Sequence, residues 1–167
     1  MGNRNNRFDT AFITKAGLIA ALYIALTFVA QAVGLASGVI QFRLSEMLTI
    51  LPMFTSAAVP GLWVGCVLAN ILTGCAMWDV VFGSLATLLG ALGTYLLRKT
   101  NNPFLGCLPP IIANMLIVPI VLMKVYGVED GFLYLMFTVG IGEVVCCGVL
   151  GVIIYKPLKK SGKFEDR

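Results

Sequence analysis

The chain contains no histidine, and only 12% of its 167 residues are charged. Soluble domains usually carry about 25% charged residues, so this is not the composition of a soluble domain. The absence of histidine excludes His-based acid–base catalysis and the intramembrane proteases that depend on it. None of the five cysteines forms a C-x-x-C pair, so we expect no zinc site and no other bound metal.

Sequence motifs for nucleotide chemistry are also missing. No G-x-x-x-x-G-K-[ST] phosphate-binding loop is present, and the Gly162-Lys163 pair lies in a basic tail. Paired acidic clusters that could hold a metal-bound diphosphate are absent, since Glu129-Asp130 is the one acidic doublet in the interior of the sequence. We therefore expect no catalytic residues, and predict that the protein is not an enzyme.

What the sequence does contain is apolar residues, which make up 59% of the chain. They gather in runs of up to about 20 residues, the length that crosses a bilayer core of roughly 30 Å. The runs cover residues 11–33, 44–56, 58–74, 79–97, 104–123 and 132–155. They predict an all-α integral membrane protein, a bundle of six transmembrane helices in one domain over residues 1–167. Ala30-Gln31-Ala32 resembles a signal cleavage site, but the run before it is too long for a signal core.

The second and third runs are short, and Pro60-Gly61 separates them, so they could instead form one kinked crossing. The basic residues distinguish five spans from six, because Lys and Arg concentrate on the cytoplasmic side. With six spans, ten of the twelve lie inside, and only Arg43 and Lys124 lie outside. The inner ten are Arg4, Arg7, Lys15, Arg98, Lys99, Lys156, Lys159, Lys160, Lys163 and Arg167. Five spans would leave only four inside, so we predict six, with both termini cytoplasmic.

Polar residues in membrane helices are costly and usually face a cavity or the bundle interior. The six-span topology brings those of this chain to the outer half of the membrane. They are Gln31, Gln41, Arg43, Glu46, Asn70, Thr73, Trp78, Asp79, Asn114 and Glu143. The pattern predicts a cup open to the outside, acidic overall, that suits a cationic or hydrogen-bond-donating ligand.

Several of these residues also have a purely structural interpretation. Asp79 could cap the helix of residues 79–97 by accepting backbone N–H bonds. Arg43 and Glu46 could pair with each other, since they are three residues apart. Asn70 and Asn114 could hold helices together by hydrogen bonds. Glu143 has small neighbours that leave space beside it, which favours a functional role.

Small residues also form a stripe on the first predicted helix. Ala16 and Ala20 are four residues apart, as are Gly17, Ala21 and Ala25. Such a stripe lets another backbone approach closely, either within the same bundle or on a partner protein. The residues alone do not distinguish the two uses.

Three segments carry a family resemblance. They are Gln41-Phe-Arg-Leu-Ser-Glu46, continuing through Leu51-Pro52 to Ala58-Val-Pro-Gly61; Leu68-Ala-Asn70; and Asp79-Val-Val-Phe-Gly-Ser-Leu-Ala-Thr-Leu-Leu89. In these segments the chain resembles the queuosine-precursor transporter (QueT) family. The likeness covers nearly the whole chain in length and helix count.

The resemblance implies a substrate-binding S-component of an energy-coupling-factor (ECF) importer in a prokaryotic plasma membrane. Its partners would be a membrane scaffold subunit and two ATPases, so the chain itself needs no cofactor. An A-x-x-x-A pattern on the first helix docks the scaffold in such proteins, and Ala16–Ala20 and Ala21–Ala25 match it. The implied cargo is prequeuosine-1 (7-aminomethyl-7-deazaguanine) or a relative such as queuine.

The chemistry of such a base suggests roles for the polar residues. One carboxylate, Glu143, would accept the N–H donors of the purine edge, and Asp79 or Glu46 would pair with the ammonium group. Donors for the ring carbonyl would come from Arg43, Asn70, Asn114 or Gln41. Trp78 or a nearby phenylalanine would stack on the ring.

Overall fold

The computed structural model describes residues 10–36, 40–162, 164 and 166, and all of its regular elements are helical. They are α1 (Thr10–Ala32), η1 (Leu44–Met53), α2 (Ala58–Leu72), α3 (Met77–Leu97), η2 (Arg98–Thr100), α4 (Pro103–Val125), α5 (Phe132–Glu143), η3 (Val144–Leu150) and α6 (Gly151–Ser161). The last three form one continuous helical rod. Four of the basic residues behind the topology prediction, Arg4, Arg7, Lys163 and Arg167, lie outside the described residues.

Each of the six predicted apolar runs corresponds to a helical segment, and the prediction of an all-α protein is confirmed. Among the described residues, four helices are long and apolar enough to cross a membrane. They are Thr10–Ala32, Met77–Thr100, Pro103–Val125 and Phe132–Ser161. The other two segments, η1 and α2, are shorter.

The η1 segment is a 3₁₀ helix enclosed by the rest of the bundle. Eight of its ten residues are buried, and at about 2.0 Å per residue it extends for roughly 20 Å, less than a bilayer core. The prediction that Pro60-Gly61 separates the two short segments is wrong. The chain turns at residues 54–57, and Pro60 and Gly61 lie in the first turn of α2. A proline fits there because the first N–H groups of a helix have no intrahelical acceptor.

Small residues set the distances between neighbouring helices. A Cβ atom on Gly61 of α2 would lie 2.7 Å from the carbonyl oxygen of Ala16, and one on Gly65 would lie 3.0 Å from the Cα of Ala20. The α3–α4 pair is equally close, since a Cβ on Gly90 would lie 2.6 Å from the Cα of Pro110. Backbones this close fix the helix positions without any charged contact.

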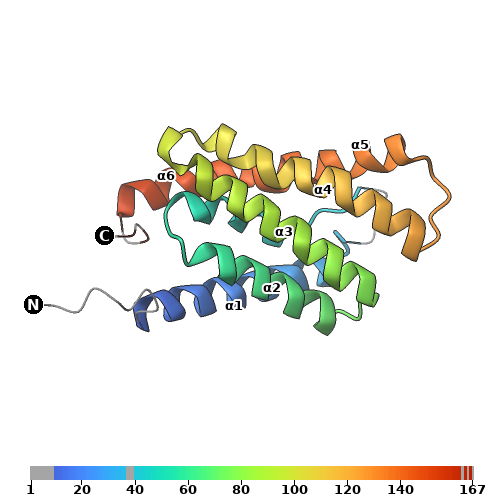
Figure 1. Cartoon of the computed structure of the whole chain (residues 1–167), viewed down its shortest axis with the longest axis horizontal. Coiled ribbons are helices and arrows are strands. Elements are labelled where there is room, and N and C mark those ends of the chain that lie inside the picture. Colours follow the sequence, from blue (N-terminus) through green and yellow to red (C-terminus); the bar gives the residue numbers. More distant parts are fainter. Residues whose placement is uncertain (1–9, 37–39, 163, 165, 167) are drawn as a thin grey trace, which may run out of the picture.

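The bundle has two chemically different ends. Its helices run back and forth along one axis, and α1 begins at the end where α6 finishes (Figure 1). At this end the Lys15 ammonium lies 3.7 Å from the Asp166 carboxylate, and Lys159 donates a 3.3 Å hydrogen bond to Asn101 beside η2. The described basic residues Lys15, Arg98, Lys99, Lys156, Lys159 and Lys160 all belong to segments that meet here. We call it the basic end.

We predict that Gly61→Ala destabilises the protein by about 1–3 kcal/mol, the usual cost of overpacking. The added methyl group must displace the α1 backbone at Ala16. Thermal unfolding of the purified protein in detergent measures the change. Gly17→Ala is the matched control, because nothing lies within 4 Å of its Cβ position. Equal melting temperatures for the two variants would contradict this account of α1–α2 packing.

Candidate functional site

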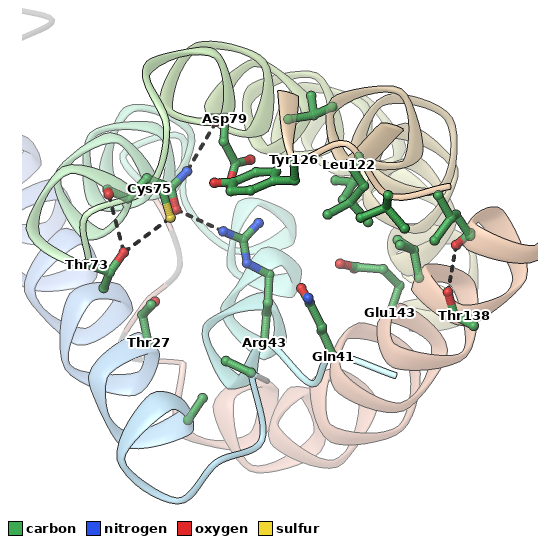
Figure 2. A pocket seen from close by; sticks show the side chains of 18 of the residues that line it. Thr27, Gln41, Arg43, Thr73, Cys75, Asp79, Leu122, Tyr126, Thr138 and Glu143 are labelled. Atoms are coloured by element: carbon green, nitrogen blue, oxygen red, sulfur yellow. Dashed lines mark hydrogen bonds between the residues drawn. The ribbon is translucent and has the colours of Figure 1, made fainter. Parts of the chain in front are cut away.

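A cavity of about 730 Å³ opens at the end of the bundle opposite the basic end. Its walls come from the last turns of α1, α2 and α4, the start of α3, the segment before η1, and α5 (Figure 2). The polar and aromatic lining residues are Thr27, Gln31, Gln41, Arg43, Asn70, Thr73, Cys75, Asp79, Tyr126, Asp130, Tyr134, Thr138 and Glu143. The predicted convergence of polar residues at one end of the bundle is therefore present.

Five of the eight side chains proposed to bind a ligand line this cavity. They are Gln41, Arg43, Asn70, Asp79 and Glu143. Residues 41 and 43 precede η1, residue 70 ends α2, residue 79 begins α3 and residue 143 ends α5. The fold brings these five residues together from four segments that are distant in sequence. Their binding of a ligand remains a prediction.

Arg43 projects into the middle of the cavity (Figure 2). Its Nη2 atom donates a 2.8 Å hydrogen bond to Oδ1 of Asn70. The alternative of an Arg43–Glu46 ion pair is wrong, because the described residues contain no such pair within 4.0 Å. Asn70 also donates to the carbonyl oxygen of Asp79 at 3.5 Å, so it joins α2 to α3 as well as lining the cavity.

Glu46 lies behind the cavity wall and not on it. Its side chain is fully buried and accepts a short hydrogen bond from the Tyr23 hydroxyl of α1. Its other carboxyl oxygen, Oε2, has no hydrogen-bond partner in the described part of the chain. Direct contact of Glu46 with a ligand in this cavity is thus not supported by its position.

Trp78 points away from the cavity. It is 60% exposed and stacks on Phe82 with ring centroids 5.9 Å apart. Both rings line a separate, shallow apolar groove between α3 and α4 that Lys124 borders. One residue along a helix turns a side chain by about 100°, so Trp78 and its neighbour Asp79 cannot face the same way. The stacking role proposed for Trp78 does not fit this position.

Asp79 does not cap α3. The N-cap residue is Ala76, and no side-chain cap bond forms there. Instead the Oδ2 atom of Asp79 accepts a 3.1 Å hydrogen bond from the hydroxyl of Tyr126, which itself accepts one from the Ala76 amide. The capping interpretation is wrong, and Asp79 faces the cavity beside Tyr126 (Figure 2).

Glu143 and Asn114 are buried polar residues whose hydrogen-bonding capacity is only partly used. Glu143 is 5% exposed and Asn114 1% exposed. The Asn114 side chain lies beside the Glu143 carboxyl group. Among the described residues, however, Oε2 of Glu143 and both polar atoms of the Asn114 side chain have no hydrogen-bond partner. Buried polar atoms are almost always paired in native proteins, so these two residues are candidates for contact with a bound molecule.

The backbone changes geometry directly after Glu143. The α5 helix ends at this residue and continues as the π-helical segment η3. Widened turns of this kind are rare and often occur at functional sites. Gly142 makes room for the neighbouring wall, since a Cβ there would clash with the carbonyl oxygen of Gln41.

Sequence reasoning missed the aromatic and hydroxyl side chains of the cavity. Tyr126 and Tyr134 line it from the end of α4 and from α5, and Thr27 and Thr138 line it from α1 and α5. Asp130 also reaches it, from the loop before α5. A usable signal was the pair of tyrosines flanking a polar loop, because tyrosine combines a flat apolar ring with a hydroxyl group.

The stripe of small residues on α1 divides into two faces. Ala16 and Ala20 face α2 and pack against Gly61 and Gly65, so the structure gives them the internal use. The docking role proposed for these two does not fit their position. Gly17, Ala21 and Ala25 are exposed on the surface of the bundle.

Comparison with known proteins identifies the family. A family model described as the QueT transporter matches residues 13–160. The Queuosine precursor transporter QueT of Lactococcus lactis subsp. cremoris (strain MG1363) is 36% identical over 78 residues, which is 46% of this chain and 45% of that protein. The chain thus aligns with less than half of this curated relative. No solved structure matches it.

These findings confirm the resemblance drawn from the sequence. The matched family is one of transporters and not of enzymes, in agreement with the expectation that the chain carries no catalysis. The several long apolar helices of this chain are those of a membrane protein. The chain belongs to the QueT transporter family.

Proposed function

We propose that this protein is the substrate-capturing S-component of an ECF-type ABC importer in the cell membrane. Its ligand is a queuosine precursor, namely prequeuosine-1, queuine or a related 7-deazaguanine. The observation that carries the proposal is the cavity, in which Arg43 and the unpartnered carboxyl oxygen of Glu143 are held by different segments. The relative's name, Queuosine precursor transporter, supports this choice of ligand.

The size and chemistry of the cavity suit a flat, polar base. Its volume of about 730 Å³ lies within the range of small-molecule sites. A deazaguanine edge presents N1–H and N2–H₂ donors, and its carbonyl oxygen needs a donor, which Arg43 or Gln41 offers. Tyr126 or Tyr134 replaces Trp78 as the surface on which the ring stacks.

The proposed topology has six crossings, with both termini in the cytoplasm. The basic end then faces the cytoplasm, as the positive-inside rule requires, and the cavity opens outward. The two short segments become crossings sheltered by their neighbours, which agrees with the burial of η1. The helices α2, α3 and α4 and the rod of α5, η3 and α6 run alternately in opposite directions (Figure 1).

The sequence has no phosphate-binding loop, so the energy for uptake comes either from an ion gradient or from ATP hydrolysis by partner subunits. In the proposed mechanism a scaffold subunit and two ATPases drive the whole chain to topple, carrying the cavity from outside to inside. The exposed face of Gly17, Ala21 and Ala25 is the docking surface for the scaffold, since small residues allow close helix contact. Ala16 and Ala20 support that helix from within.

The alternative is a stand-alone secondary transporter for a cationic or purine-like solute. Its ionisable cavity residues would then couple transport to an ion gradient. Uptake that persists after deletion of the scaffold and ATPase genes, and stops with an ionophore, favours this alternative. Uptake lost on that deletion favours the S-component.

We predict that Arg43→Gln weakens binding of prequeuosine-1 by at least about tenfold, the effect of losing a charge-assisted hydrogen bond. Arg43 is the one basic side chain among the described lining residues. Isothermal titration of the purified protein measures the affinity. Lys124→Gln, a charge change outside the cavity, serves as the control and leaves it unchanged. An Arg43→Gln protein that binds like the wild type would exclude Arg43 from the site.

We predict that Ala21→Leu prevents copurification with the scaffold subunit while ligand affinity is retained. A leucine on the exposed face blocks close approach of a partner helix but touches nothing in the bundle interior. Ala20→Leu is the contrasting variant, because Ala20 is 7% exposed and packs on Gly65, so it lowers the melting temperature. Undiminished scaffold binding by Ala21→Leu would rule out this face as the docking surface.

A further inference from the structure

The carboxyl groups of the cavity lie in unequal surroundings. Glu143 is 5% exposed, and its Oε2 atom has no partner. Asp79 is partly exposed and already accepts a hydrogen bond from Tyr126, and Asp130 is exposed in the loop before α5. Water therefore reaches the two aspartates more readily than Glu143, whose carboxyl group is almost entirely buried in the cavity wall.

Charges in the buried part of the site do not balance. Glu46 and Glu143 are both buried and lie close enough to interact electrostatically. Arg43 is the basic residue that acts on both of them. One guanidinium is therefore near two buried carboxyl groups. Without a bound cation, these three side chains together carry either an excess negative charge or an additional proton. An unpaired charge away from water is strongly unfavourable.

The two ends of a 7-aminomethyl-7-deazaguanine differ in their ability to correct this imbalance. Its guanine-like edge donates hydrogen bonds but is neutral. Its aminomethyl group is positively charged at neutral pH and has three N–H donors. Glu143 lines the cavity, and the Asn114 side chain lies beside its carboxyl group. The carboxylate of Glu143 and the amide oxygen of Asn114 are both acceptors that suit the N–H donors of an ammonium group.

We propose that the ammonium group of the ligand binds at Glu143, with the neutral ring edge toward Asp79, so that the site selects cationic 7-deazaguanines over neutral ones. This inference rests on the proposed function, and it reverses the assignment that the sequence suggested. The ring then lies between these two carboxylates, next to Tyr126, which donates a hydrogen bond to Asp79, and next to Arg43, which projects into the cavity (Figure 2). Glu46 acts as a positioning residue that supplies negative charge behind the wall.

The test compares two probes that share one ring, the cationic 7-aminomethyl-7-deazaguanine and the neutral 7-cyano-7-deazaguanine. Affinities are measured by isothermal titration with the full chain in lipid nanodiscs, for the wild type, Glu143→Gln and Asp79→Asn. Both substitutions keep the side-chain shape, and melting temperatures establish that each variant is folded.

We expect the wild type to bind the cationic probe about 10- to 100-fold more tightly than the nitrile, as for a hydrogen bond to a charged group. In Glu143→Gln this ratio falls to within about threefold of unity, chiefly because the cationic probe binds less tightly. In Asp79→Asn both probes weaken alike and the ratio persists.

A ratio that persists in Glu143→Gln and collapses in Asp79→Asn would place the ammonium at Asp79 and overturn the inference. Equal wild-type affinities for the two probes would overturn it as well, while leaving the proposed function intact. A folded wild-type protein that binds neither probe would refute the proposed function, and the inference with it.

Discussion

The chain must hold ionised and amide groups in an environment that does not solvate them, and the rest of the structure follows from how this is done. Arg43 has Asn70 as a partner, and one carboxyl oxygen of Glu46 has Tyr23. The other oxygen of Glu46, one oxygen of Glu143 and the amide of Asn114 have no hydrogen-bond partner among the described residues. The cost of leaving such atoms bare is of the order of 1–3 kcal/mol each. A ligand that supplies the missing partners recovers this free energy on binding.

The bundle keeps these groups in place through close backbone contacts. Gly61 against Ala16 and Gly90 against Pro110 fix α1 on α2 and α3 on α4. Between them the short η1 helix passes through the interior and brings Glu46 to α1. A site assembled from many segments is thereby held by packing that does not itself depend on charge. This arrangement leaves the cavity residues free for recognition.

Much of this architecture could be predicted from the sequence. The apolar runs located every helix within a few residues, and the distribution of basic residues identified the end of the bundle away from the cavity. What could not be predicted was rotation about the helix axes. Trp78 and Asp79 are adjacent in sequence yet face opposite environments. Glu46 likewise points away from the cavity, toward Tyr23 of α1.

The aromatic lining was missed for a related reason. In apolar runs, tyrosines are expected at the membrane surface, and only the folded loop between α4 and α5 brings Tyr126 over Asp79. The two faces of the α1 stripe could not be told apart from the sequence, because Ala20 and Ala21 are the same residue type and each has an alanine four residues away. The packing of α2 against Ala20 shows which face lies inside the bundle.

Mass spectrometry of the small molecule that copurifies with the protein tests the central claim most directly. We predict prequeuosine-1, queuine or another 7-deazaguanine in the extract of the purified membrane protein. The same extract from a variant with Glu143 and Arg43 both replaced by alanine would lack it. An unrelated solute bound in the wild type, or a deazaguanine retained by that double variant, would contradict the claim that this cavity captures the base.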